Sequence, residues 1–275
     1  LTGLSAHSGT SSGASTAVNR FLISAAHRSS GKTVVSAGLA TALTRRGHKV
    51  STFKKGPDYI DPMWLGLACG QPCWNLDFFT MGRDEIRECF VRQSAGADVV
   101  LIEGNKGLFD GLDVEGGDSN AALAKLLNIP VVLVIDVTGM TRGIAPLLSG
   151  YIAFDPDVRI AGVVLNRVAG PRQEHKLRAA IDRYTDLTVL GAIPRSEELH
   201  IEERHLGLVT SVEHDRADIW LDSVAKTVDA AVDIEALLGL TDGFTEKMLV
   251  EPVKKKQTVD LRVGIARDKA FGFYY

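Results

Sequence analysis

The stretch FLISAAHRSSGKT at residues 21–33 decides the fold of this chain. Its first five residues form an apolar run typical of a buried strand, and a helical pattern follows at residues 32–46. A loop that enters a helix through Gly31, Lys32 and Thr33 turns backbone N–H groups toward a phosphate at the helix N-terminus. The stretch therefore predicts a phosphate-binding loop, with Ala26 in place of the first glycine of the usual pattern. The alternative is a capped helix start with a solvated lysine.

Beyond this stretch, short apolar runs alternate with helical patterns. Each run is nearly all apolar, as a strand must be when helices cover both faces of a parallel sheet. We expect an α/β fold of the P-loop NTPase type, doubly wound around a mostly parallel sheet, over about residues 20 to 210. The further expected strands are residues 49–53, 99–103, 131–136, 160–166 and 189–193. The further expected helices are residues 84–94, 119–127, 141–154, 171–184 and 216–238.

Composition excludes several classes of protein. The 275 residues are 45% hydrophobic and 24% charged, which is typical of a globular protein. Lys and Arg total 31 against 34 Asp and Glu, so there is no basic field for nucleic acid. The longest apolar run, residues 131–137, contains Asp136 and is far shorter than the roughly 20 residues that cross a bilayer. Three cysteines without a disulfide pattern favour structural thiols in a reducing compartment, so we expect a cytoplasmic protein.

The chain is expected to divide into four parts. Residues 1–20, rich in Ser, Thr and Gly, predict a disordered leader. Residues 21–240 form the nucleotide-binding domain, and the polar residues 241–258 are a linker. Residues 259–275 read as the start of a further, truncated domain.

Two acidic loops are expected beside the phosphate-binding loop. Lys32 would reach the β- and γ-phosphates and is expected to face solvent, while Thr33 would place its hydroxyl on Mg²⁺. A metal ion needs further oxygen ligands. Asp58 and Asp61 follow the second strand, and Glu103 ends the third, so all three lie at the same sheet edge. Turn-forming aspartates and a capping glutamate are the alternative.

The last strands end in polar residues that could contact a nucleotide. Asn166 has an amide that can donate to and accept from a base edge, and Arg167 follows it. A simple turn explains this pair equally well. The residues expected to bind ATP are Ser29, Ser30, Gly31, Lys32, Thr33, Asn166, Arg167 and Pro194.

Several longer motifs carry a family resemblance. The runs FKKGPDYIDP at 53–62, EGNKGLFDG at 103–111, LNRV at 165–168 and ERHLGL at 203–208 resemble the cobyrinic acid a,c-diamide synthases. These are glutamine-dependent amidases with a dethiobiotin-synthetase-like ATP domain, and the likeness covers residues 21 to about 209. The run RVGIARDKAFGFYY at 262–275 resembles the first strand of the family's glutaminase domain.

The resemblance implies a reaction and a set of roles. ATP would phosphorylate the a and c acetate carboxylates of a tetrapyrrole, and ammonia, free or from glutamine, would displace the phosphate. Lys32 would stabilise the γ-phosphate, with Thr33 and Glu103 on Mg²⁺. Asp58 and Asp61 would assist the metal or the substrate carboxylate, so that Lys32, Asp58, Asp61 and Glu103 form the catalytic set and Thr33, Asp58 and Glu103 the metal set. Asn166 would read adenine, and the substrate would be bordered by Lys55, Tyr59, Lys106, Asp110 and Arg204.

One departure from the family bears on the substrate. Many members have Val-Met where this chain has Asn105-Lys106, and the motifs are closer to a branch thought to amidate sirohaem. Lys106 would favour an additional substrate carboxylate. A ParA-like nucleotide-switched ATPase and a dethiobiotin-synthetase-type enzyme remain alternatives. The sequence does not determine the oligomeric state, and a homodimer is compatible with it.

Overall fold

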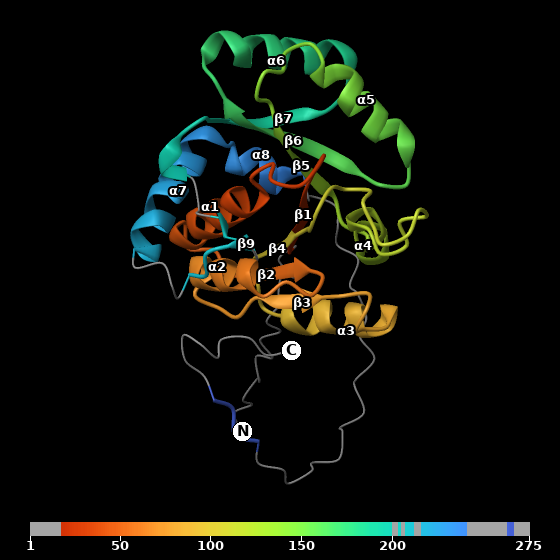
Figure 1. Cartoon of the computed structure of the whole chain (residues 1–275), viewed down its shortest axis with the longest axis vertical. Helices are drawn as coiled ribbons and strands as arrows, with labels where there is room; N and C mark the ends of the chain where they lie inside the picture. The colour runs from red at the N-terminus through yellow and green to blue at the C-terminus, as the bar shows by residue number, and fades with distance from the viewer. Residues whose placement is uncertain (1–17, 200–202, 205–206, 212–215, 241–262, 267–275) are drawn as a thin grey trace, which may run out of the picture.

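The computed structural model describes residues 18–199, 203–204, 207–211, 216–240 and 263–266. Within these residues, one sheet of seven parallel strands has the order β3-β2-β4-β1-β5-β6-β7 (Figure 1). The expected doubly wound α/β fold is confirmed. The strands are β1 Asn19–Ala25, β2 Val50–Lys55, β3 Trp74–Leu76, β4 Val99–Glu103, β5 Val131–Asp136, β6 Ile160–Val168 and β7 Thr188–Pro194. A short antiparallel pair, β8 Glu203–Arg204 and β9 Gly207–Leu208, lies outside this sheet.

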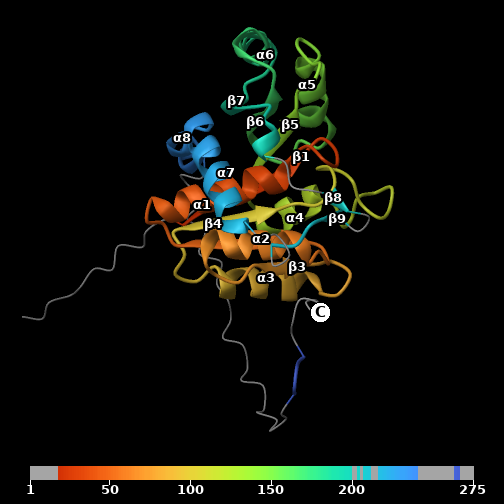
Figure 2. The same ribbon diagram turned by 60° about the vertical axis from the view of Figure 1, so that its left-hand side comes forward.

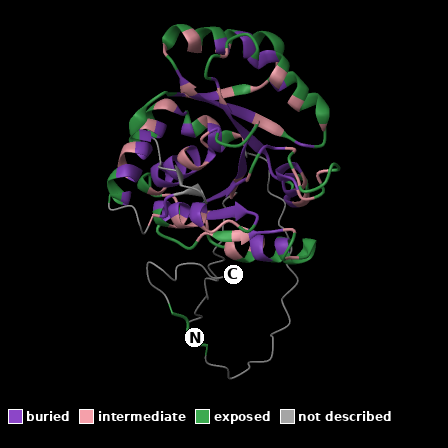
Figure 3. Cartoon of the chain, viewed as in Figure 1, coloured by how far each residue is buried: buried purple, intermediate pink, exposed green. Residues whose placement is uncertain are grey.

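Helices cover both faces of the sheet, and each face has its own hydrophobic core (Figures 2 and 3). One core joins the sheet to α1 Lys32–Arg45, α2 Ile60–Cys69, α7 Ala217–Ala231 and α8 Ile234–Gly239. The other joins it to α3 Arg83–Gln93, α4 Asn120–Leu127, α5 Ile144–Phe154 and α6 Pro171–Tyr184. Because β1, β2, β4, β5 and β6 lie between these layers, their residues are almost all buried, which explains the continuous apolar runs of the sequence.

The sheet has its topological switch point at β1. The chain builds β2, β3 and β4 on one side of β1 and β5, β6 and β7 on the other. Ile23 of β1 pairs with Glu103 of β4, and Lys54 of β2 also pairs with Glu103. Ligands of such sheets bind at the carboxyl ends of the strands beside the switch point. The fold therefore brings the phosphate-binding loop and both acidic loops to one edge.

Several elements differ from expectation. Helix α2 and strand β3 were not anticipated, because Gly56, Pro57 and Asp58 mark a turn and hide the helix that follows. The carboxylate of Asp58 caps that helix, with Oδ1 accepting from the amide N–H of Ile60 over 2.9 Å. The helix expected at 216–238 is two helices, because Val232 is extended and bridges to Gly191. Strand β1 begins two residues before the expected start, so residues 19 and 20 join the sheet rather than the leader.

Most of the proposed flanking segments lie outside the described residues. These are the leader up to residue 17, the linker at 241–258 and most of the segment at 259–275. None of the described helices is both long enough and apolar enough to cross a membrane.

Candidate functional site

The phosphate-binding loop lies between β1 and α1 and contacts Asn166 of β6. Gly31 has φ +88°, and a Cβ there would overlap the side-chain amide of Asn166. That amide donates to the carbonyl oxygen of Ser30 over 2.8 Å. Lys32 is only 8% exposed, so the expectation that it faces solvent is wrong. No hydrogen bond or ion pair within 4 Å joins its ammonium to a described residue, and an anion bound at this loop would stabilise so buried a cation.

Thr33 connects this loop to the end of β4. Its hydroxyl donates to Oε1 of Glu103 over 2.8 Å. The carboxylate of Glu103 is fully buried, yet its second oxygen, Oε2, has no hydrogen-bond partner among the described residues. A buried carboxylate oxygen without a donor costs free energy unless a cation or a donor reaches it.

Lys54 occupies the centre of the acidic cluster. Its buried ammonium donates to Asp61 Oδ2 over 2.5 Å, to Glu103 Oε1 over 2.8 Å and to the carbonyl oxygen of Gly104 over 3.2 Å. Asp58 Oδ2 lies 3.8 Å away. Lys54 precedes the two aspartates in the sequence, but no role for it is predicted from the sequence. Successive side chains of a strand point to opposite faces of the sheet, so one of Lys54 and Lys55 must lie on the same face as the acids. That alternation is the sequence feature that predicts a lysine in the acidic cluster.

Burial disfavours the charged form of every group in this cluster, whereas a neighbouring opposite charge favours it. The balance of the two effects sets the direction of each pKa shift. Burial raises the pKa of Glu103 to about 7, against the opposing effect of Lys54. Burial also lowers the pKa of Lys32 to about 8. For Lys54 burial acts downward, but the carboxylates of Glu103 and Asp61 outweigh it and raise the pKa above its usual value. For Asp61 burial acts upward, but Lys54 outweighs it and lowers the pKa. Burial and then the charge of Asp61 raise the pKa of Asp58.

A further residue that the sequence did not suggest, Asn120, organises the loop after β4. Its amide nitrogen donates to Ser24 Oγ over 3.0 Å and to the carbonyl oxygens of Asn105 and Gly107. Its Oδ1 accepts from the Asn105 amide N–H over 3.2 Å. A Cβ at Gly104 would collide with this side chain at 2.7 Å, so a glycine is needed there. Asn120 follows the N-cap residue of α4, and a capping pattern gave no reason to expect a polar side chain turned inward.

The expected substrate residues are only partly brought together. Lys55 is buried on β2, and Lys106 is exposed on the loop after β4 with φ +40°. Asp110 accepts from the Gly107 amide N–H over 2.9 Å and so closes its own loop. Tyr59 precedes α2 and packs against the core beside α1. Arg204 lies in β8, and its side chain is outside the described part.

The expected nucleotide-contacting residues lie along one edge. Ser29, in the phosphate-binding loop, and Arg167, at the end of β6, both have positive φ values, 56° and 61°. Arg167 donates to Asp136 Oδ2 over 2.6 Å, which links the ends of β5 and β6. Pro194 is exposed at the end of β7. Left-handed backbone at non-glycine residues is costly and concentrates at functional sites. The role of Asn166 in reading a base stays a prediction.

The donor set fits a magnesium ion better than a metal held by protein alone. Among the described residues, no group of three or more His, Cys, Asp or Glu side chains is arranged to hold a metal. Mg²⁺ keeps several waters and usually takes one or two protein oxygens beside the phosphates. The hydroxyl of Thr33 and the unpartnered Oε2 of Glu103 are such oxygens. Asp58 uses Oδ1 to cap α2, and its role as a metal ligand stays a prediction.

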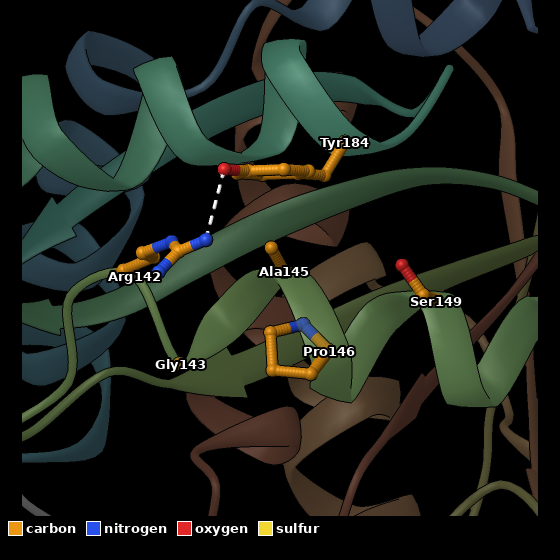
Figure 4. A pocket seen from close by; sticks show the side chains of 6 residues that line it. All are labelled: Arg142, Gly143, Ala145, Pro146, Ser149 and Tyr184. Carbon is orange, nitrogen blue, oxygen red and sulfur yellow. Dashed lines mark hydrogen bonds between the residues drawn. The ribbon is translucent and has the colours of Figure 1, made fainter.

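Two surface pockets lie away from this cluster. The first, of about 490 Å³, lies between α5 and α6 (Figure 4). Arg142 donates to the Tyr184 hydroxyl over 3.0 Å at one end of it, as the dashed line shows. The second lies between α3, α4 and the loop at 109–117. Neither pocket is lined by the phosphate-binding loop or by Glu103.

Comparison with known proteins gives close relatives of this chain. The CbiA family model, described as the CobQ/CobB/MinD/ParA nucleotide binding domain, matches residues 23–209. A cobyrinate a,c-diamide synthase of Magnetococcus marinus is 47% identical over 265 residues, covering 94% of this chain and 57% of the relative. A hydrogenobyrinate a,c-diamide synthase of Brucella ovis is 41% identical over 256 residues, covering 93% and 58%. The chain thus spans a little over half the length of these relatives.

Solved structures give more distant matches. The signal recognition particle receptor FtsY of Elizabethkingia anophelis, in complex with GDP, has a TM-score of 0.49 and 14% identity, covering 76% of this chain and 64% of its own. The family model begins within β1 and ends just after β9, and it therefore includes the phosphate-binding loop, the Lys54 cluster and Glu103. The chain belongs to the CbiA family of nucleotide-binding domains, and the resemblance of its motifs to the cobyrinic acid a,c-diamide synthases is confirmed.

Proposed function

We propose that this chain uses ATP to activate the a and c acetate carboxylates of a tetrapyrrole for amidation. The names of its relatives support cobyrinate or a related macrocycle as the substrate class. Sirohaem stays a further candidate on the basis of the Asn105-Lys106 departure. The observation that carries the proposal is the state of Glu103, which gives one oxygen to Thr33 and Lys54 and leaves the other unpartnered beside the phosphate-binding loop.

The chemistry requires a phosphoryl transfer followed by an acyl transfer. A substrate carboxylate oxygen attacks the γ-phosphorus of ATP, the bond to the β-phosphate oxygen breaks, and ADP leaves. Ammonia then attacks the acyl carbon, the C–O bond to phosphate breaks, and a proton is lost from nitrogen to give the amide. Carboxylates need this activation because oxide is a poor leaving group and phosphate is a good one.

The residues of the site contribute positioning and charge rather than covalent chemistry. Lys32, cationic near neutral pH, would neutralise the transferring phosphoryl group. Bound Mg²⁺ would neutralise phosphate charge, with Thr33 and Glu103 as its protein ligands. Lys54 would keep the carboxylates of Asp61 and Glu103 fixed, so that neither turns toward the incoming substrate acid and repels it.

The nitrogen donor in this proposal is ammonia, either free or released from glutamine. Glutaminase chemistry needs an activated cysteine with a base beside it. Cys69 and Cys89 are buried, and Cys73 is partly buried. Burial raises the pKa values of Cys73 and Cys89, which disfavours their thiolate forms. We therefore expect this chain to use free ammonia in vitro, while glutamine serves as the donor when a glutaminase is supplied.

The proposal is tested by incubating the chain with MgATP, ammonium and cobyrinic acid, with sirohaem in a parallel reaction. Mass spectrometry of the tetrapyrrole should show stepwise conversion of carboxylate to amide, and ADP should form in step with it. No amide and no ADP above background with either compound would contradict the proposal. ATP-driven dimerisation without any carboxylate would favour the ParA-like alternative. ATPase stimulated by a diaminononanoate, and not by tetrapyrroles, would favour the dethiobiotin-synthetase type.

A further inference from the structure

Lys55 is a buried cation whose nearest counter-ion among the described residues lies beyond hydrogen-bond distance. It follows Lys54 on β2, so its side chain points to the opposite face of the sheet, away from the Asp61 and Glu103 cluster. Only 3% of the residue is exposed. Its nearest counter-ion is Asp118, whose Oδ2 lies 3.9 Å from the ammonium, beyond hydrogen-bond distance. No described residue accepts a hydrogen bond from it. A buried ammonium in this state is costly unless a ligand completes its shell.

The acids around Lys55 are largely engaged elsewhere. Asp118 uses Oδ1 to accept from the Leu112 amide N–H over 2.7 Å, and this bond closes the loop after β4. Asp77 accepts from the Phe79 amide N–H over 3.2 Å and from the Thr80 hydroxyl over 3.0 Å. Both carboxylates therefore stabilise their own loops, and part of their hydrogen-bonding capacity is used there rather than on Lys55.

A second lysine, Lys106, acts electrostatically on Lys55 from the loop after β4. After burial and the facing Asp118, the charge of Lys106 is the next influence on the pKa of Lys55, and it acts with burial to lower it. Lys106 is exposed and has the left-handed φ of +40°. Each of two such cations disfavours the charged form of the other, and an anion bound beside both would offset this effect.

The position of Lys106 is fixed by its neighbours. Asn120 donates to the carbonyl oxygens of Asn105 and Gly107, the residues on either side of it. A Cβ at Gly56 would lie 2.9 Å from the Asn105 amide nitrogen, so the loop after β4 rests directly on the turn that follows Lys55. Asn105 Oδ1 is also buried and accepts no hydrogen bond from the residues that the structure describes. Lys55 is thus held at the end of β2 and Lys106 on the loop that rests against the turn after β2, and such fixed positions favour a preorganised binding site.

We propose that Lys55 and Lys106 form a subsite for a second carboxylate of the substrate, distinct from the carboxylate that is phosphorylated. This inference rests on the proposed function, because it requires a substrate with several acidic arms. Glu103 and its partner Lys54 lie on one face of the sheet edge, and Lys55 points to the opposite face. A polycarboxylate that places one arm at the phosphate-binding loop presents another arm here, where it is held by charge-assisted hydrogen bonds.

The test compares Lys106→Gln and Lys55→Gln with the matched control Lys176→Gln, which removes an exposed lysine from α6. Binding of cobyrinic acid is measured by absorbance titration in the presence of MgADP, and MgADP binding is measured separately. We expect about tenfold weaker cobyrinic acid binding in Lys106→Gln, the equivalent of one charge-assisted hydrogen bond. MgADP affinity should be unchanged in both site variants, and the control should match the wild type in both assays.

A second experiment changes the carboxylates of the substrate rather than the lysines of the protein. Cobyrinic acid with its carboxylates partly methyl-esterified should bind more weakly to the wild type than the free acid, and Lys106→Gln should discriminate less between the two. Since Lys55 is buried, urea denaturation is used to check that Lys55→Gln folds. If Lys55→Gln is unstable, the test rests on Lys106→Gln alone. Unchanged cobyrinic acid affinity in Lys106→Gln, or an equal loss in Lys176→Gln, would overturn the subsite. A wild-type chain that binds no tetrapyrrole would instead overturn the proposed function.

Discussion

The hydroxyl of Thr33 donates to Oε1 of Glu103 over 2.8 Å and joins two residues that are 70 positions apart in the sequence. The same oxygen accepts from Lys54 over 2.8 Å, whereas Oε2 of Glu103 accepts from no described residue. One oxygen of this buried carboxylate therefore belongs to the internal network, and the other is available to a ligand. The adjacency of β1 and β4 makes this division possible.

Thr33→Ala should reduce the effect of Mg²⁺ on nucleotide binding. The change removes a metal-ligating hydroxyl and one of the two donors that orient Glu103. We expect affinity for MgATP to fall about tenfold or more, the range typical of groups that support a metal site, while affinity measured in EDTA changes little. Isothermal titration with and without Mg²⁺ measures both. Thr44→Ala, in the same helix but bonded only to the carbonyl oxygen of Ala40, is the control. An equal loss in EDTA would place the effect on the loop rather than on the metal.

Lys54→Met should destabilise the fold strongly. The variant leaves the buried carboxylates of Glu103 and Asp61 without their shared cation, and such a loss typically costs about 3 to 5 kcal/mol. The free energy of unfolding from urea denaturation measures it. Adding Glu103→Gln to Lys54→Met should recover part of the loss, because it removes one of the stranded charges. If the double variant is less stable than Lys54→Met alone, the cation is not what holds these acids.

Much of the fold could be predicted from the sequence because burial between two helical layers leaves strands with a plain signature. The runs at β4 and β5 are apolar up to the acidic residue that ends each strand, and their bounds agree with the expected ones to the residue, as do those of α6. Strand β3 has three residues at the sheet edge, one of them exposed, so it carries no such run. Helix α2 begins after a turn sequence, and only the Asp58 cap marks its start.

The site was predicted in outline but not in its internal bonding. Parallel topology is enough to bring Gly31, Asp58, Asp61 and Glu103 to one edge. Which lysine enters the acidic cluster depends on the phase of β2, since Lys54 and Lys55 point to opposite faces. The inward amide of Asn120 depends on contacts between segments distant in sequence, and no local pattern encodes them.

Glu103 should make stability fall as pH rises in the metal-free protein. The unfolded carboxyl titrates near 4.5, and burial raises its pKa to about 7 in the folded state. Between these values the folded chain binds more protons than the unfolded chain, so raising the pH favours unfolding. Relative to Glu103→Gln, the wild type should lose on the order of 3 kcal/mol from pH 4.5 to 7. Urea denaturation across this range gives the difference, and parallel curves for the two proteins would contradict the shift.

Asn120→Ala should loosen the loop after β4. It removes the donor to Ser24 and to two backbone carbonyl oxygens, and it opens a buried polar gap beside Gly104. We expect about 2 to 3 kcal/mol of lost stability, since several buried groups lose their partners. Ser119→Ala, which removes only the N-cap bond of α4, should cost about 1 kcal/mol. Similar losses in both variants would reduce the role of Asn120 to helix capping.

Tyr151 should matter to the phosphate-binding loop although it lies on α5. Its hydroxyl donates to the carbonyl oxygen of Ala26 over 2.7 Å, at the position where the usual loop pattern has its first glycine. Its ring lies 5.4 Å from that of Phe109 in the loop after β4. Gly107 of the same loop approaches Ala26 so closely that a Cβ would come within 2.6 Å of its carbonyl oxygen. The entry of the phosphate-binding loop is thus held from two sides.

Tyr151→Phe keeps the ring contacts and removes only the hydrogen bond. We expect a loss of about 1 kcal/mol in stability and a several-fold rise in the Kd for MgATP, because the loop loses one of its two supports. Tyr184→Phe is the matched control, since its hydroxyl accepts from Arg142 at the pocket between α5 and α6. Nucleotide titration and urea denaturation of both variants measure the effects. A stability loss without any change in nucleotide affinity would mean that Tyr151 supports the packing of α5 and not the shape of the loop.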